Sequence, residues 1–68
     1  MSKVLSAQDV ANLLRTRKEL VLKMLDQGEI PAVRIGNNWK VDEDQLHEWF
    51  TSKASKEARA RRELNNEG

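Results

Sequence analysis

Cysteine is absent from this 68-residue chain, and proline, glycine and histidine are scarce, with one, three and one residue respectively. Without cysteine, neither a disulfide framework nor a thiolate metal site can stabilise the fold. A lone histidine offers no metal site, and together with scattered carboxylates it provides no constellation for catalysis. We therefore expect a protein that is not an enzyme and that needs no metal or other cofactor.

Long apolar runs are also missing. No stretch approaches the roughly 18 consecutive apolar residues that a membrane span requires, so we expect no membrane partner and a cytoplasmic location. Apolar residues make up 38% of the chain, below the roughly 45–50% of typical globular domains. Part of the chain is therefore not expected to pack into the single small core that this length permits.

The charges are segregated along the chain, although their sum is only +1. Residues 1–41 carry a net charge of +3, residues 42–52 carry −4, and residues 53–68 carry +2. An acidic block thus separates two basic regions. This distribution predicts one solvated acidic face and one or two cationic faces.

Three apolar stripes with helical spacing predict three short helices. The first helix follows Ser6, which is suited to cap it, with Asp9 near the positive end of the helix dipole. The third helix follows Asp42, another capping residue. The side chains expected to face the core are Val10, Leu13 and Leu14 in the first helix, Val21, Met24 and Leu25 in the second, and Leu46, Trp49 and Phe50 in the third.

The second helix, expected between Thr16 and Gly28, is the one that we expect to carry the function. Thr16 and Glu19 have the spacing of a capping box, and Gly28 is suited to a left-handed C-cap. The first helix is expected to end at Leu14 or Arg15, only a residue or two earlier. Two helices joined so tightly must cross at a large angle, as in a helix-turn-helix.

The outer side of this second helix carries Arg17, Lys18 and Lys23. Cations are unfavourable near the N-terminus of a helix, and a bound phosphate would supply a reason for them there. A short helix with an apolar back and a cationic front is a candidate for the major groove of DNA. Leu20 and Leu22 cannot easily both face inward, so we expect one in the core and one exposed.

The periodicity changes at Pro31, which disfavours helical backbone at the residue before it. Residues 33–35 and 39–41 predict two short strands, joined by a turn at residues 36–38 because glycine and asparagine tolerate positive φ. A hairpin this short is not stable alone, so it must pack against the helices. We expect Trp39 to make the main contact between the hairpin and the helices.

The predicted hairpin also carries two cations, Arg34 and Lys40. We expect them to share one face, opposite Val33 and Ile35, and to contact phosphates. Asn37 and Asn38 are first of all turn-forming residues, with contact to DNA as a secondary role.

Residues 53–68 lack bulky apolar side chains except Leu64 but are rich in good helix formers. We expect a folded domain over residues 1–52 and a basic tail over residues 53–68, which either extends the third helix or folds only on a partner. The tail could follow the DNA backbone, dock on another protein, or remain solvated.

The order of these elements resembles the excisionase-type DNA-binding domain, a small winged helix-turn-helix related to the MerR group. The resemblance covers about residues 4–50, and its most specific part is the run Gly-Glu-Ile-Pro-Ala-Val-Arg-Ile-Gly at residues 28–36. It implies a mainly α fold with three helices and a two-stranded wing. It also implies that the second helix enters the major groove while the wing reaches phosphates or the minor groove.

The chain departs from the usual pattern of that family in three places. Arg15-Thr16-Arg17 stands where Gly-Val-Ser is usual, leucines stand at 20 and 22 in place of hydroxyl or aromatic residues, and Asn37-Asn38 replaces a basic pair. These changes leave the expected fold intact and leave the DNA sequence that is recognised open.

The residues expected to contact DNA are Arg15, Thr16, Arg17, Lys18, Leu20, Lys23, Arg34, Asn37, Asn38 and Lys40. Excisionase-type proteins belong to phages and mobile elements, and they bend DNA and bias an integrase toward excision. The resemblance therefore implies sequence-specific binding to double-stranded DNA in a bacterial nucleoid or a phage-infected cell. It also implies two further partners, an integrase and further copies of the chain bound cooperatively. A small transcriptional regulator, a phage DNA-packaging recognition domain and a protein-interaction module without DNA remain alternatives.

Overall fold

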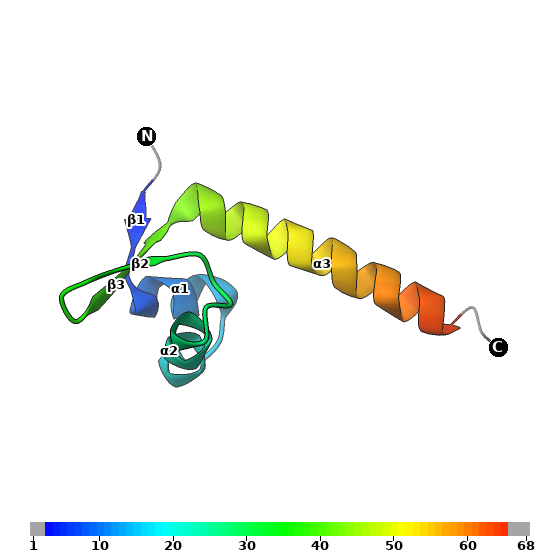
Figure 1. Ribbon diagram of the computed structural model, residues 1–68, viewed down its shortest axis with the longest axis horizontal. Helices are drawn as coiled ribbons and strands as arrows, with labels where there is room; N and C mark the ends of the chain where they lie inside the picture. Colours follow the sequence, from blue (N-terminus) through cyan, green and yellow to red (C-terminus); the bar gives the residue numbers. More distant parts are fainter. Residues whose placement is uncertain (1–2, 66–68) are drawn as a thin grey trace.

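A small body with one long projecting helix is seen in the computed structural model, which describes residues 3–65 (Figure 1). The elements follow in the order β1 (Val4–Leu5), α1 (Ala7–Leu14), α2 (Lys18–Asp26), β2 (Val33–Ile35), β3 (Asn38–Asp42) and α3 (Glu43–Asn65). The expected mainly α architecture with a two-stranded wing is confirmed. In addition, β1 pairs with β3 and completes a three-stranded antiparallel sheet with the order β1-β3-β2. The ends of the predicted domain and tail, residues 1–2 and 66–68, lie outside the described residues.

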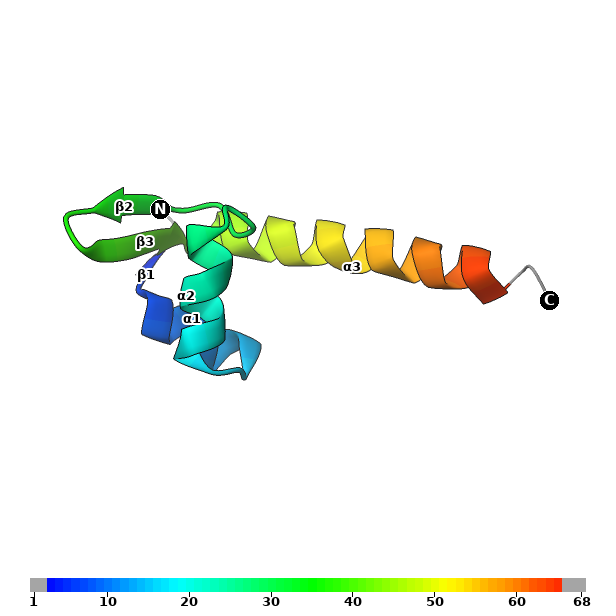
Figure 2. The ribbon, with the colours of Figure 1, turned by 60° about the horizontal axis from the view of Figure 1, so that its bottom comes forward.

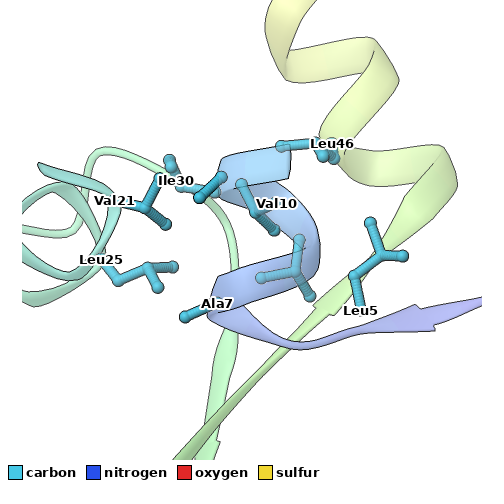
Figure 3. Packing of buried hydrophobic residues seen from close by; sticks show 9 residues of the cluster. Leu5, Ala7, Val10, Val21, Leu25, Ile30 and Leu46 are labelled. Atoms are coloured by element: carbon cyan, nitrogen blue, oxygen red, sulfur yellow. The ribbon is translucent and has the colours of Figure 1, made fainter. Parts of the chain in front are cut away.

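The core lies where α1, α2 and β1 meet the beginning of α3 (Figure 3). Val21 and Leu25 of α2 lie on one side of α1, and Leu46 of α3 approaches from the other. The buried side chains are Leu5, Ala7, Val10, Ala11, Val21, Leu25, Ile30, Val41 and Leu46, and the half-buried Leu14, Met24, Ala32, Trp39 and Trp49 pack against them.

Two of the side chains expected in the core are exposed. Leu13 is 56% exposed and Phe50 is 53% exposed, so the prediction was wrong for both. The reason is that α1 and α3 leave an uncovered groove between them, and Leu13 and Phe50 lie on its walls.

A capping box begins α1, as the sequence predicts. The hydroxyl of Ser6 accepts a hydrogen bond from the backbone N–H of Asp9 at 3.1 Å, and the Asp9 carboxylate accepts one from the backbone N–H of Ser6 at 3.0 Å. Hydrogen bonding to Ser6 holds the pKa of the Asp9 carboxyl below its usual value. The backbone N–H of Ser6 has the larger effect and its hydroxyl the smaller one. These bonds satisfy N–H groups that a helix start otherwise leaves unpaired.

The connection from α1 to α2 differs from the prediction. Arg15 lies in the left-handed region with φ 55°, and the N–H of Thr16 donates to the carbonyl of Ala11 at 2.9 Å. Thr16 therefore closes α1 and does not cap α2. The capping box predicted for Thr16 and Glu19 was wrong, because Arg17 is the N-cap of α2 and makes no side-chain capping bond.

Replacing Arg15 with glycine is expected to raise the melting temperature. A residue other than glycine in the left-handed region costs of order 1–3 kcal/mol, and the greater freedom of glycine in the unfolded chain offsets part of that gain. A net gain of about 1 kcal/mol corresponds to roughly 4–8 °C in a domain of this size. Thermal unfolding followed by circular dichroism measures it. Arg15→Ala is the control because alanine keeps the strained Cβ, and equal melting temperatures for the two variants would contradict the explanation.

The end of α2 agrees with the sequence. Gly28 has φ +76°, and the following N–H, that of Glu29, donates to the carbonyl of Met24 at 2.9 Å. This is the left-handed C-cap that was predicted from the glycine.

The wing has a shorter turn than predicted, and this changes which side chains share a face. Asn38 belongs to β3 and pairs with Ile35, so that Val33 lies opposite Lys40 and Arg34 lies opposite Trp39. Residues directly opposite each other on an antiparallel pair share a face. The prediction that Arg34 and Lys40 share a face was therefore wrong.

Helix α3 begins at a capping residue and extends well beyond the rest of the fold. The Asp42 carboxylate accepts a hydrogen bond from the backbone N–H of Gln45 at 3.0 Å, which confirms the third predicted cap. The helix is 23 residues long and continues without interruption past residue 52, and in Figure 2 its distal half extends alone, away from the body. The division into a domain and a tail at that residue stays a prediction. No helix within residues 3–65 has the length and apolar character to cross a membrane.

Candidate nucleic-acid interface

A hollow of about 260 Å³ lies where the start of α1, the first half of α2 and the tip of the wing meet. It is lined by Ser6, Ala7, Gln8, Lys18, Leu22, Asn37, Asn38 and Trp39. Three of the predicted DNA-contacting residues are thus brought together, Lys18 from α2 and Asn37 and Asn38 from the wing, and we call these three the wing–helix cluster. An ammonium group and two amides can donate to phosphate oxygens, and the amides can also pair with base edges.

The outer face of α2 is less cationic than the sequence reasoning assumed. Lys18 and Lys23 are exposed on this helix, but so are Glu19 and Asp26. Within α2 itself the exposed charges are therefore balanced, and Arg17, the exposed N-cap, supplies the excess of positive charge at the N-terminal end. Any attraction for an anion is concentrated at this end of the helix.

Three other predicted residues lie away from the wing–helix cluster. Arg15 borders a groove between the end of α1 and the start of α3, together with Glu43. Thr16 and Leu20 border a second groove, which runs along α3 beside Trp49. The structure does not bring these three side chains to the hollow that the wing shares with α2.

Leu20 and Leu22 are both exposed, by 45% and 37% respectively, so the prediction that one of them joins the core was wrong. Val21 and Leu25 already fill the side of α2 that faces α1. The two leucines lie on either flank of that side, Leu22 toward the wing and Leu20 toward α3.

The two cations of the wing are held in different ways. The guanidinium carbon of Arg34 lies 5.5 Å from the centre of the Trp39 ring, a distance that allows a cation–π interaction. Lys40 is on the opposite face of the sheet, beside Val33. Arg34 therefore stays near the half-buried Trp39, while Lys40 extends from the other face of the wing.

Two polar residues that line the hollow, Ser6 and Gln8, were not among the residues expected from the sequence to contact DNA, although Ser6 was expected to cap the first helix. The amide of Gln8 donates to the side-chain oxygen of Asn12 at 3.1 Å, and both residues are exposed. The capping serine was a usable signal, because helix starts present N–H groups and a positive dipole end to anions. Within residues 3–65 no three histidine, aspartate or glutamate side chains are grouped so that they could hold a metal ion.

Comparison with known proteins agrees with this geometry. The sequence profile of the helix-turn-helix domain family matches residues 4–54. Two proteins of Mycobacterium tuberculosis, MT0521 and Rv0500A, whose names contain the words DNA-binding protein, are each 34% identical to the chain over 47 residues. The alignment covers 69% of this chain and 60% of each relative, so the chain spans less than two thirds of their length. No solved structure matches the chain.

The residues that match the family profile, 4–54, contain α1, α2, the whole wing and the first half of α3. The chain therefore belongs to the helix-turn-helix domain family.

Proposed function

We propose that the chain binds double-stranded DNA in a sequence-specific manner and acts without catalysis. The observation that supports this most is the wing–helix cluster, in which Lys18 at the start of α2 borders the same hollow as Asn37 and Asn38 of the wing. A helix and a wing that are joined in this way can engage neighbouring grooves of one duplex. The names of the two mycobacterial relatives support the same function.

The roles proposed for individual residues follow from their positions. Arg17 and Lys18 lie at the positive end of α2, where cations are unfavourable until an anion such as a phosphate is bound. Lys23 and Leu22 lie farther along the exposed side, where an ammonium can reach guanine and a leucine can contact the methyl group of thymine. Arg34 and Lys40 supply phosphate contacts from the two faces of the wing.

Within this function we propose an architectural role of the excisionase type. The support is the run from Gly28 to Gly36, which carries the resemblance to that family and leads from α2 into the wing. An integrase that docks on the distal half of α3, and further copies on adjacent sites, are part of the proposal. Gel mobility of circularly permuted DNA measures bending. Mobility that varies with the position of the site is expected, and an unbent site would favour a transcriptional regulator.

The dependence of binding on salt tests the proposal of DNA binding itself. If about six phosphates are neutralised, the logarithm of the affinity should fall against the logarithm of the salt concentration with a slope of about −5, since each contact contributes about −0.9. Fluorescence anisotropy with duplexes selected from a random pool measures this slope. A pool from which no duplex is enriched, or a slope near zero, would contradict the proposal and favour a protein-interaction module.

A further inference from the structure

An apolar groove of about 540 Å³ lies between the end of α1 and the start of α3. Its apolar walls are formed by Leu13, Leu14, Leu46 and Phe50. Leu13 and Phe50 are each more than half exposed, so no part of the described chain covers this groove. Large apolar side chains gathered on an open surface mark a place where another molecule binds.

A second groove, of about 250 Å³, continues the first along α3. The two grooves share Phe50, and the second adds Leu20 of α2 and the half-buried Trp49. We call this continuous surface, which follows α3 from Glu43 to Glu57, the α3 groove. With a rise of about 1.5 Å per residue, α3 covers roughly 21 Å between these two residues, the length of about four helical turns.

The rim of the α3 groove carries more acids than bases. Glu43 and Asp44 border the end beside α1, and Glu57 borders the other end together with Lys53, whose ammonium lies 3.3 Å from the Glu57 carboxylate. Within residues 3–65 neither Glu43 nor Asp44 takes part in an ion pair, and Arg15 is one cation against these two acids. The dipole of α3 accounts for acids in its first turn, but it gives no reason for the exposed apolar side chains beside them.

We infer that the α3 groove is the docking site for a basic amphipathic helix of another protein. A helix of about four turns fits along it and can present apolar residues at i, i+4 and i+7 to Leu13, Leu20 and Phe50. Lysines or arginines beside that apolar row then pair with Glu43 and Asp44. An acidic helix would instead bring like charges together, so the charge of the rim selects a basic partner.

The chain itself does not offer such a helix. Residues 51–65, the projecting part of α3, contain Leu64 as their one bulky apolar residue. The occupant must therefore come from a different protein. No residue lines both the α3 groove and the hollow beside the wing, so a helix docked here leaves the wing–helix cluster open. Docking of such a helix does not depend on the proposed DNA binding.

Selection of helical peptides displayed on phage tests the chemistry of the occupant. The bait is the full-length chain, and the library consists of helices of about four turns with every position randomised. We expect enrichment of peptides that combine a row of apolar residues at helical spacing with a surplus of lysine and arginine. No enrichment, or enrichment of peptides without that surplus, would overturn the inference.

Two matched variants test whether the selected peptide binds in the α3 groove. Phe50→Asp should weaken binding, measured by fluorescence anisotropy, by about 30-fold or more, the range for losing an anchor residue of an interface. Leu64→Asp is the control, because it introduces the same charge on the same helix at a side chain that is 74% exposed and outside the groove. Circular dichroism verifies that both variants keep their helices. Equal losses of affinity, or no loss with Phe50→Asp, would contradict docking at this surface.

Removing charge from the rim tests the basic character of the partner. Glu43→Gln together with Asp44→Asn should weaken binding of the selected peptide by about 2- to 30-fold, the range for losing two exposed ion pairs. Asp26→Asn together with Glu29→Gln is the control, since it makes the same two chemical changes at exposed residues outside the groove. A loss of equal size in both variants would overturn the inference.

Sedimentation equilibrium of the full chain covers the case of a second copy in the groove. We expect a monomer, and a dimer that Phe50→Asp dissociates would show that the chain is its own occupant and would overturn the inference. None of these experiments contains DNA, so their outcome can be told apart from that of the proposed DNA binding.

Discussion

Replacing Lys18 with glutamate is expected to weaken binding to the selected DNA by about 10- to 100-fold, the range that corresponds to losing one hydrogen bond from a charged group, about 1.5–3 kcal/mol. The change places a negative charge at the start of α2, in the hollow shared with Asn37 and Asn38 of the wing. In the proposed interface Lys18 contacts a phosphate, so the introduced carboxylate is expected to repel the DNA. Fluorescence anisotropy at fixed salt concentration measures the affinity of the variant and of the wild type.

Lys56→Glu is the matched control for this prediction. It changes the net charge by the same amount but lies on the distal half of α3, far along the chain from the wing–helix cluster. A uniform electrostatic attraction between chain and DNA would weaken equally in both variants. Equal losses of affinity would therefore contradict a localised interface, whereas a loss confined to Lys18→Glu would support it.

Leu25→Ala is expected to leave the chain largely unfolded at physiological temperature. Leu25 is 2% exposed and packs between α2 and α1. Removing a buried leucine side chain costs about 2–5 kcal/mol because transfer energy is lost and a cavity remains. A core in a chain of this size rarely supplies more than about 3–5 kcal/mol, so one such change consumes most of the stability. Urea unfolding followed by circular dichroism gives the free energy.

Leu22→Ala removes the same atoms from the same helix, but at a position that is 37% exposed. Its cost is expected to stay within about 1 kcal/mol, because part of the side chain already contacts water in the folded state. If the two variants unfolded at the same urea concentration, the packing described for α2 would be wrong.

The features that could be predicted from the sequence are those set by signals within a few residues. Ser6 and Asp42 each cap a helix through a side chain that bonds to a nearby N–H, and Gly28 ends α2 because it tolerates positive φ. Such contacts depend on local spacing alone. The element order, and with it the fold class, followed from them together with the change of periodicity at Pro31.

The features that could not be predicted depend on contacts between elements. Whether Leu13 and Phe50 are buried depends on how far α3 stays in contact with α1, which no local pattern records. The position of Arg34 depends on whether the turn of the wing has two residues or three, and one residue of difference moves a side chain to the other face. At the candidate interface this register places Arg34, and not Lys40, on the same face as Trp39.

The left-handed residue between α1 and α2 was also hidden, because Arg15 carries no local signal for that conformation. In the excisionase-type pattern that the sequence resembles, glycine stands at this position, and glycine would adopt the positive φ found at Arg15 without strain. With arginine in place of glycine at this position the fold is less stable, and the arginine side chain borders the groove beside α3.

One further consequence follows from the direct junction between β3 and α3. The strand ends at Asp42 and the helix starts at Glu43, so no loop separates the wing from the projecting helix. With a rise of about 1.5 Å per residue, the 23-residue helix is roughly 34 Å long, and a tilt of about 10° at the junction would displace its far end by about 6 Å. The strand and the helix thus form a mechanical lever, in which a small rotation of the wing becomes a large displacement at the far end of α3.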